Sequence, residues 1–320
     1  MMDWTDRYCR RILRLLAPEA LVYTEMVTAM ALLHGDRSRL LDFDAMEQPL
    51  ALQVGGSEPK ILAQAARLGE EWGYREINLN VGCPSDRVQS GAFGACLMRE
   101  PQLVRDCVAA MAEAVSIPVT VKCRLGIDEQ REEDTFFEFV DQVSAVCQVF
   151  IVHARKAWLK GLSPKQNRDV PPLRYELVQQ LKQQRADLQV ILNGGLTTLE
   201  QVASALTWAD GVMIGRQAYH HLYFWADCHR LIYPDRAIPT PTELITQLLP
   251  LVERDCQAGL KVSATTRHLM GLVTRQKGAR VFKQTLTRLA AEYPFNAAIL
   301  LEALRAISDS PAVVSAELLG

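Results

Sequence analysis

The feature that most constrains the fold of this chain is an alternation of short apolar runs with longer segments of helical periodicity. Such alternation is typical of βα units that build a parallel sheet. Helices are expected between the runs, for example over 59–72, with Ser57 as its cap, and over 101–114. We count seven apolar runs: Leu21–Thr24, Leu50–Val54, Glu76–Asn80, Pro118–Cys123, Val149–His153, Gln189–Asn193 and Gly211–Gly215.

Seven runs are one short of the eight strands that a closed barrel needs. Residues 1–16 have the pattern of a loop and helix whose strand would come before Met1. We therefore predict an α/β fold, a (β/α)8 TIM barrel that lacks its first strand in this sequence. A start placed inside a longer natural chain is the expected origin. Because an open barrel leaves backbone groups unpaired, this form is expected to be less stable and to hold a cofactor weakly.

A proline-rich stretch, Pro234–Pro241, separates these runs from a segment with helical period and no strand signals. We predict two domains, a barrel over residues 1–236 and a small helical domain over 242–310. The net charge is only −2, but the helical segment is locally basic. Such a run is either a solvated helix surface or a site for a polyanion. Between residues 256 and 291 there is no Asp or Glu, and the basic residues are Lys261, Arg267, Arg275, Lys277, Arg280, Lys283 and Arg288.

Several functions are disfavoured by composition. No apolar run approaches the roughly 20 residues that span a bilayer, and no export signal opens the chain, so a cytoplasmic protein without membrane contact is expected. Eight cysteines are scattered without a C-x-x-C pair, which argues against a zinc ribbon, an iron–sulfur cluster or a disulfide scaffold. We expect reduced thiols, no metal, and a monomer.

Glycines follow the last two predicted strands, where barrels favour phosphate sites. One run ends in Asn193-Gly194-Gly195 and the other in Gly215-Arg216. Glycine lets backbone amides approach a phosphate closely, and arginine adds charge-assisted hydrogen bonds. A tight turn would explain either motif alone, but the pair favours a phosphate-bearing cofactor.

Polar residues also end three internal strands, where side chains point into the barrel mouth. Lys122 there could stabilise the negative charge that grows on the N1/O2 side of a flavin as it is reduced. Gln53 could give an amide hydrogen bond to the same ring, and His153 ends a further strand. A surface lysine and a core histidine are the plain structural alternatives.

The sharpest motif is Asn78-Leu-Asn-Val-Gly-Cys-Pro-Ser85, a strand that runs into a Gly-Cys-Pro turn. Pro84 excludes Cys83 from the helical region, so the thiol should be held at the rim. A thiol whose pKa is about 8.5 is mostly protonated at neutral pH, and it can act as a general acid toward a carbanion. The alternative is a buried apolar filler, which we expect of the other cysteines.

At this motif the chain resembles the tRNA-dihydrouridine synthases, and the likeness covers nearly all of it. Residues 156–168, followed by Pro171-Pro172, look like the A subgroup, which modifies D-loop uridines at or beside position 20. The motifs that carry the resemblance are Met1-Met2-Asp3-Trp4-Thr5-Asp6, Asn80-Val-Gly-Cys-Pro84, Lys122-Cys-Arg-Leu-Gly126, His153-Ala-Arg155, Asn193-Gly-Gly195 and Gly215-Arg216.

The resemblance implies a two-stage reaction, in which NADPH reduces bound FMN and the flavin passes hydride to C6 of uracil. Cys83 would then protonate C5, and Asn80 is similar to the family's base-contacting asparagine. The base must leave the tRNA stack to reach a barrel mouth, so phosphate contacts elsewhere have to offset that cost. The implied FMN-binding residues are Met1, Met2, Gln53, Lys122, His153, Asn193, Gly194, Gly195, Gly215 and Arg216, and the implied tRNA contacts at the D-loop and elbow are Lys165, Arg168, Arg280 and Lys283.

Two alternatives remain at this point. Another FMN-dependent barrel reductase, similar to dihydroorotate dehydrogenase and acting on a free pyrimidine, shares the phosphate loops but does not need a basic helical appendage. A catalytically retired RNA-binding protein would not need Cys83, Lys122 and His153.

Overall fold

The structure is a computed structural model that describes residues 1–85, 91–274 and 277–308. It divides into two compact units, a first unit of residues 1–7 and 19–215 and a second unit of residues 8–18 and 216–320. Arg275 of the basic stretch, and the last two residues of the predicted helical domain, lie outside the described residues.

The first unit is built on one eight-stranded parallel sheet. Strands pair in the order β1-β3-β4-β5-β6-β7-β8, and β2 pairs with β3 beside β1. Within the described residues no pairing joins β8 to β1, so the sheet is an open barrel wall. The strands are β1 (Val22–Tyr23), β2 (Val27–Thr28), β3 (Leu50–Gly55), β4 (Glu76–Asn80), β5 (Val119–Cys123), β6 (Val149–His153), β7 (Gln189–Asn193) and β8 (Gly211–Met213).

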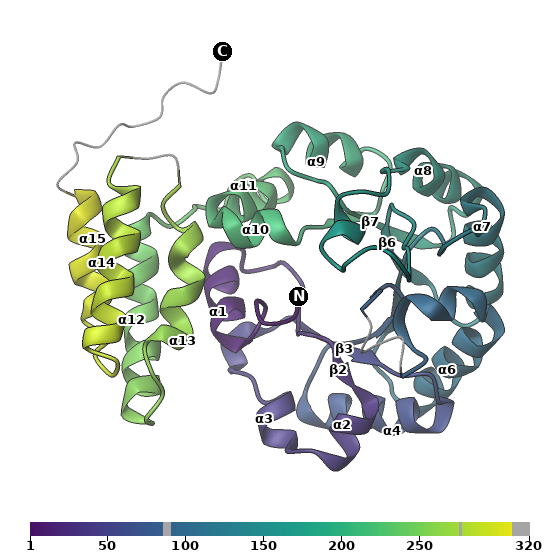
Figure 1. Cartoon of the computed structure of the whole chain (residues 1–320), viewed down its shortest axis with the longest axis horizontal. Coiled ribbons are helices and arrows are strands. Elements are labelled where there is room, and N and C mark those ends of the chain that lie inside the picture. Colours follow the sequence, from purple (N-terminus) through teal and green to yellow (C-terminus); the bar gives the residue numbers. More distant parts are fainter. Residues whose placement is uncertain (86–90, 275–276, 309–320) are drawn as a thin grey trace. The chain divides into compact units, whose positions relative to one another are not determined.

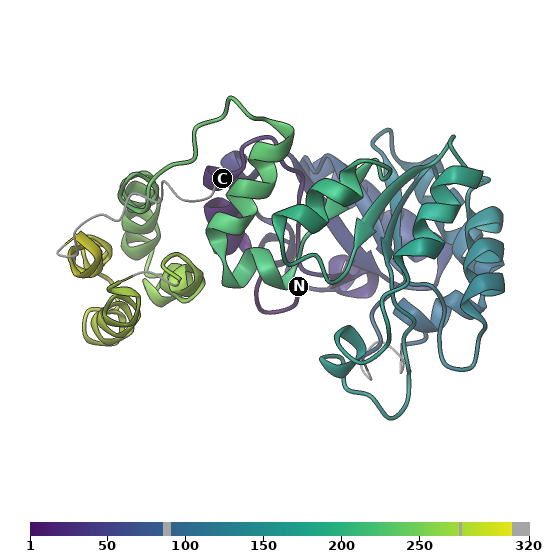
Figure 2. The same ribbon diagram turned by 90° about the horizontal axis from the view of Figure 1, so that it is seen from above.

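Helices cover the outer face of this sheet (Figure 1). The helix α4 packs on β3 and β4, α6 on β5, α8 on β7 and α9 on β8. The helices of the first unit are α2 (Ala29–His34), α3 (Arg37–Leu41), α4 (Pro59–Trp72), α6 (Pro101–Ala114), α7 (Glu132–Val143), α8 (Tyr175–Gln184) and α9 (Leu199–Leu206), with short 3-10 turns η1 (Ala45–Glu47), η2 (Gly94–Arg99) and η3 (Gln166–Arg168). In Figure 2 the teal loop that follows β6 and carries η3 projects beyond the strands.

Each strand divides its side chains between the outer helices and the barrel interior, because successive residues point to opposite faces. On β4, Ile77 is fully buried on the outer side, where a side chain at Gly69 of α4 would collide with it. Asn78 and Asn80 point to the other face, where both are buried and hydrogen-bonded. The interior of this barrel is therefore partly polar.

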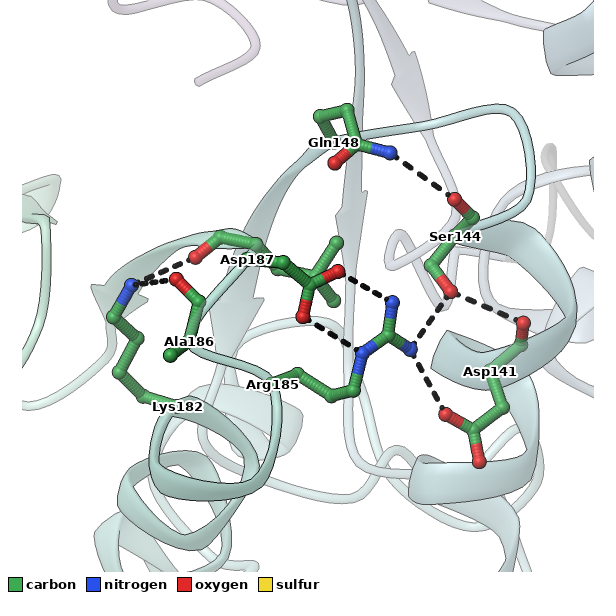
Figure 3. Close-up of polar contacts among 8 residues, drawn as sticks. Asp141, Ser144, Gln148, Lys182, Arg185, Ala186 and Asp187 are labelled. Atoms are coloured by element: carbon green, nitrogen blue, oxygen red, sulfur yellow. Dashed lines mark hydrogen bonds and ion pairs between the residues drawn. The ribbon is translucent and has the colours of Figure 1, made fainter.

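A cluster of ion pairs and hydrogen bonds lies at the amino ends of β6 and β7 (Figure 3). Arg185, which ends α8, donates to both carboxylate oxygens of Asp187 at 3.0 and 2.8 Å and to Asp141 of α7 at 3.1 Å. Lys182 pairs with Asp210, which precedes β8, at 2.8 Å. Both cations of this cluster, Lys182 and Arg185, are thus paired with carboxylates.

The second unit is entirely helical in its described residues. Arg11 of α1 pairs with Asp255 of α12 at 2.6 Å, and the Trp225 indole of α11 donates to the Leu13 carbonyl at 3.1 Å, so α1 is fixed to helices far along the chain. The helices are α1 (Arg7–Leu16, all but its first residue), α10 (Arg216–His220), α11 (Leu222–Ile232), α12 (Pro241–Gln257), α13 (Ser263–Thr266), α14 (Ala279–Glu292) and α15 (Ile299–Ser308), with η4 (Arg267–Gly271).

The predicted barrel without one strand, followed by a helical C-terminal region, is confirmed. Details differ at the ends of elements. The 59–72 helix has the predicted bounds, but Glu58 and not Ser57 occupies its N-cap, with no side-chain cap hydrogen bond. The last strand stops at Met213, and β2 was not predicted.

Three further properties follow from the described residues. None of the eight cysteines takes part in a disulfide, and five of them are buried. No group of three or more metal-ligating side chains gathers in the part of the chain that is described. Across the same ranges, no helix has the length and apolarity needed to cross a membrane.

Candidate active site

Cys83 lies in a turn directly after β4, at the carboxyl end of the sheet. The side chain of Asn80 accepts hydrogen bonds from the backbone N–H groups of Gly82 and Cys83, at 3.0 and 2.9 Å. The Cys83 carbonyl accepts from the N–H of Ala95 at 2.9 Å. The thiol is half-buried and donates to the Ser85 hydroxyl at 3.5 Å. The predicted turn therefore holds the thiol in place without burying it.

Lys122 lies beside Asn80, because these two residues are register partners on β5 and β4. Its ammonium group donates to the Asn193 side chain at 3.1 Å, and the described residues offer it no ion pair. Burial, together with the charge of Arg124, lowers the pKa of Lys122 from 10.5 to about 8. The Asn193 amide nitrogen donates to the Met213 carbonyl at 2.7 Å, and this bond orients the amide oxygen that accepts from Lys122.

His153 ends β6 next to Asn193 and is buried against the glycine pair that follows β7. A Cβ atom at Gly194 would lie 2.5 Å from the His153 ring, and one at Gly195 would lie 2.3 Å from Leu173. Both glycines have positive φ, 108° and 68°. Only glycine fits these two successive positions, because a side chain at either would collide with His153 or Leu173.

The other predicted cofactor residues lie at the neighbouring strand ends of the same sheet. Gln53 is buried on β3, and its amide is bonded to Asn78 and Asn80. A Cβ atom at Gly215 would lie 3.3 Å from the sulfur of Met1, so the first residue lies against the turn after β8. Met2 is 56% exposed. Arg216 is the first residue of α10 and belongs to the second unit.

Arg124 joins the Cys83 turn to the loop after β6. Its guanidinium is 3% exposed and donates to the carbonyls of Gly82, Lys156 and Asn167, at 2.9, 3.0 and 2.9 Å. Burial, opposed by Cys83 and aided by the charges of Arg168 and Arg155, lowers the pKa of Arg124 from 12.5 to about 10.

The same loop carries two of the predicted tRNA contacts. Lys165 is exposed and precedes η3, while Arg168 ends η3 and is half-buried. Asn167 between them is fully buried and bonds the backbone of Trp158 in both directions, at 2.7 Å each. Hydrogen bonds therefore hold this loop in a defined conformation. Through Arg124 the loop that carries Lys165 and Arg168 is connected to the Cys83 turn.

The whole described chain matches a known family. The model of the dihydrouridine synthase (Dus) family matches residues 1–308. The chain belongs to the dihydrouridine synthase family. The resemblance that the motifs predict is thus confirmed.

Curated relatives are similar over most of their length. The chain is 55% identical over 290 residues to a tRNA-dihydrouridine(20/20a) synthase of Xanthomonas campestris pv. campestris, covering 90% of this chain and 86% of the relative. Proteins of the same name from Xylella fastidiosa and a Synechocystis species are 52% and 53% identical, covering 97% and 90% of this chain and 91% and 86% of theirs.

A solved structure shares the fold at low sequence identity. It is a 2-naphthoyl-CoA reductase in complex with 2-naphthoyl-CoA, with a TM-score of 0.51 at 9% identity. The match covers 71% of this chain and 46% of that chain. This likeness supports the barrel architecture of the dihydrouridine synthase family.

Three residues of the basic stretch, Arg280, Lys283 and Arg288, lie on α14 of this family member. Arg280 is exposed and Lys283 is half-buried in its first two turns, and the described residues give neither an ion pair. Phe282 and Leu286 face inward on the same helix. Arg288 is paired with Glu292 at 2.9 Å. Of the cations on α14, Arg280 and Lys283 are thus available to an outside anion.

Sequence reasoning missed three of the residues that build this site. Arg124 was named only as part of a motif, yet it bonds three loop carbonyls. Asn78 and Thr120, both fully buried, connect Asn80 to Glu76 at the far end of the same strand. The signal was present in the alternation Glu76-Ile-Asn-Leu-Asn80, whose polar face could have been assigned to the barrel interior.

Proposed function

We propose that this chain reduces uridine to 5,6-dihydrouridine in the D-loop of tRNA, at positions 20 and 20a, using FMN and NADPH. The observation that carries the proposal is the setting of Cys83, a thiol held at the end of β4 by Asn80 and next to Lys122. The family and the names of its curated relatives support the same reaction.

Two features of the first unit support FMN as the cofactor. The turn at Gly194 and Gly195 suits a phosphate, because two glycines without side chains let their backbone amides approach it closely. Lys122 is a half-buried cation whose partner among the described residues is an amide oxygen, so an anionic ring edge would complete its surroundings. We assign Gly215 and Arg216 to the phosphate as well.

The remaining cofactor contacts are assigned along the strand ends. Gln53 and His153 would meet the ring, and Met1, Met2 and Asn193 would line its edge. FMN, when bound, supplies a hydride to C6 of the uracil. Before that, FMN would accept a hydride from NADPH.

Cys83 would hold the proton that C5 of the uracil receives, because a base that gains hydride at C6 becomes basic at C5. The backbone hydrogen bonds of the turn keep the thiol at the rim while the base enters. Asn80 would orient the base from the same strand end. Arg124 would keep the turn and the η3 loop in register.

Binding of tRNA would draw on cations in both predicted domains, the barrel over 1–236 and the helical domain over 242–310. Lys165 and Arg168 would contact the backbone beside the extruded base, and Arg280 and Lys283 would contact phosphates elsewhere on the tRNA. Extrusion costs a few kcal/mol, which such phosphate contacts offset.

One experiment tests this function directly. The purified chain, loaded with FMN, is incubated with an unmodified tRNA transcript and NADPH, and dihydrouridine is mapped by mass spectrometry. We expect dihydrouridine at positions 20 and 20a. A free pyrimidine in place of tRNA is the control and should remain unreduced, whereas its reduction without any change in tRNA would contradict the proposal.

A further inference from the structure

A column of buried polar side chains crosses the interior of the first unit between β3, β4 and β5. Barrel interiors are usually filled by branched apolar side chains, and a buried polar group is costly unless it is hydrogen-bonded. Asn78 and Thr120 are fully buried, while Gln53, Glu76 and Asn80 are each 9% exposed. A column of this kind therefore requires a physical reason.

The upper half of the column ends on the Cys83 turn. The Asn80 side-chain oxygen receives two backbone N–H groups, those of Gly82 and Cys83. The Asn80 amide nitrogen donates to the Gln53 side-chain oxygen at 2.9 Å. The Gln53 nitrogen then donates to the Asn78 side-chain oxygen at 2.9 Å.

The lower half ends on a carboxylate at the amino end of β4. Asn78 donates to the Thr120 hydroxyl oxygen at 2.8 Å. Thr120 donates to Glu76 Oε1 at 2.7 Å, and the Tyr23 hydroxyl donates to the same oxygen at 2.7 Å. Burial raises the pKa of Glu76, but Oε1 can accept both bonds in either protonation state.

Every hydrogen bond in this column points the same way, from the Cys83 turn toward Glu76. The direction is fixed at both ends, because a backbone N–H can only donate and Oε1 of Glu76 acts as an acceptor. Between the two ends, each carboxamide must direct its oxygen toward the Cys83 turn and its nitrogen toward Glu76. Hydrogen bonds aligned in this way also strengthen one another.

We propose that Glu76 and Thr120 are positioning residues, which set the direction of this column and so hold Asn80 and the Cys83 turn ready for protonation of the uracil. The inference rests on the proposed function for its catalytic consequence. The column does not carry a proton, since three of its members are carboxamides and it ends on the Cys83 backbone N–H rather than on the thiol.

Cutting the column at Thr120 would remove the lower of the two constraints on the three carboxamides, so that only the backbone N–H groups of the turn would still orient them. If Asn78 turned over, Gln53 would have to follow and then Asn80. The Asn80 nitrogen would then face the N–H groups of Gly82 and Cys83, and two donors would meet. Loss of the hydrogen bonds at Thr120 should thus weaken those that Asn80 accepts from the Cys83 turn.

The test compares Thr120→Val, which keeps the shape but lacks the hydroxyl, with Thr120→Ser, which restores it. Ile77→Val, on the outer face of the neighbouring strand β4, is the packing control. Three rates are measured on the FMN-loaded protein: reduction by NADPH, dihydrouridine formation by the pre-reduced protein with a tRNA transcript, and alkylation of Cys83 by iodoacetamide, followed by peptide mass spectrometry. The alkylation rate does not depend on the proposed reaction.

For Thr120→Val we expect dihydrouridine formation to fall about tenfold and Cys83 alkylation to rise severalfold, the size of losing one buried hydrogen bond. The rate of reduction by NADPH should change least of the three, because the column reaches the flavin only through Gln53. Thr120→Ser should restore both altered rates, and Ile77→Val should leave all three unchanged. In Glu76→Gln a side-chain nitrogen can take the place of the acceptor oxygen. This variant should lower dihydrouridine formation and raise Cys83 alkylation, each by about threefold.

Two outcomes would overturn the inference. One is unchanged alkylation and dihydrouridine formation in both Thr120→Val and Glu76→Gln, and the other is an equal loss in Thr120→Val and Thr120→Ser. If the unaltered protein forms no dihydrouridine but Thr120→Val still raises Cys83 alkylation, the proposed function fails and the positioning column stands.

Discussion

The two ends of the parallel sheet in the first unit use charged side chains in opposite ways. At the amino end, Arg185 is met by Asp141 and Asp187, and these hydrogen bonds raise the pKa of Arg185 and lower that of Asp187 (Figure 3). At the carboxyl end, Lys122 and Arg124 meet only amide and carbonyl oxygens within the described residues. Burial lowers the pKa of Lys122 to about 8 and that of Arg124 to about 10.

This difference indicates that the charged residues at the amino end serve stability and those at the carboxyl end serve ligand binding. Cations matched by carboxylates contribute to the folded state and leave little net field for a ligand. Cations met by neutral oxygens are costly to bury, and an incoming anion recovers that cost. The carboxyl end is therefore preset for a phosphate and an electron-rich ring, while the amino end holds the strands in place.

Of the substitutions at the two ends of the sheet, Lys122→Met should have the largest effect. Loss of a charged hydrogen-bond donor should weaken FMN retention about tenfold to a hundredfold, measured as flavin content after dialysis. The FMN-free variant should melt at a higher temperature than the FMN-free unaltered protein, because a charge that is costly to desolvate is gone. Lys122→Arg is the control and should show no such gain.

The gain in melting temperature should depend on pH. The folded pKa of Lys122 is about 8 and its ordinary value is 10.5, so the unfolded chain binds more protons between these values. The penalty is complete below pH 8 and fades as the pH rises toward 10.5. A Lys122→Met advantage that grew with rising pH would contradict this account.

Removing Arg185 at the other end should change stability and leave the chemistry alone. Arg185→Ala loses a partly exposed network, so we expect about 1 kcal/mol off the free energy of unfolding in urea titrations, with turnover and flavin content unchanged. Arg131→Ala is the control, because the Arg131–Asp134 pair is mostly exposed and should contribute almost nothing.

The Arg185 effect has its own pH dependence. Arg185 lowers the pKa of Asp187 below 3.8, so this stabilisation is present above that value and is lost as the pH falls through the lowered pKa. The stability difference between Arg185→Ala and the unaltered protein should therefore shrink in acid. A loss of flavin with the stability unchanged would show that the amino end also serves binding.

The smallest effects are expected on the second unit, where the cations are exposed and act singly. Arg280→Ala and Lys283→Ala should each weaken binding of all tRNAs severalfold and reduce the slope of log affinity against log salt by about one. Arg288→Ala is the control, since Arg288 is paired with Glu292 and should change the slope less. Slower flavin reduction by NADPH in these variants would mean that the tRNA surface and the redox site are not separate.

Most of the barrel could be predicted because buried parallel strands are continuous apolar runs between turn residues. The bounds of β4, β6 and β7 agree with the sequence to the residue. The two-residue strand β2 has no periodicity to detect. The grouping of residues 8–18 with the C-terminal helices depends on contacts such as Arg11–Asp255, which join positions far apart in the chain.

The candidate site was predictable where one residue type alone suits a position. A thiol before proline and glycines after a strand are signals of that kind, and the structure places Cys83 and the Gly194-Gly195 pair at one end of the sheet. The partners of Arg124 and Thr120 were not predictable, because those hydrogen bonds link segments about forty residues apart.

The role of Cys83 is the central claim, and one single-turnover measurement tests it. Cys83→Ala protein is loaded with FMN, reduced with NADPH, separated from excess NADPH and mixed with an unmodified tRNA transcript, while flavin absorbance and dihydrouridine are followed. We predict normal reduction by NADPH, normal tRNA affinity, and dihydrouridine formation at least a hundredfold slower than in the unaltered protein, as expected for a lost general acid. Dihydrouridine formation at the unaltered rate would contradict the account.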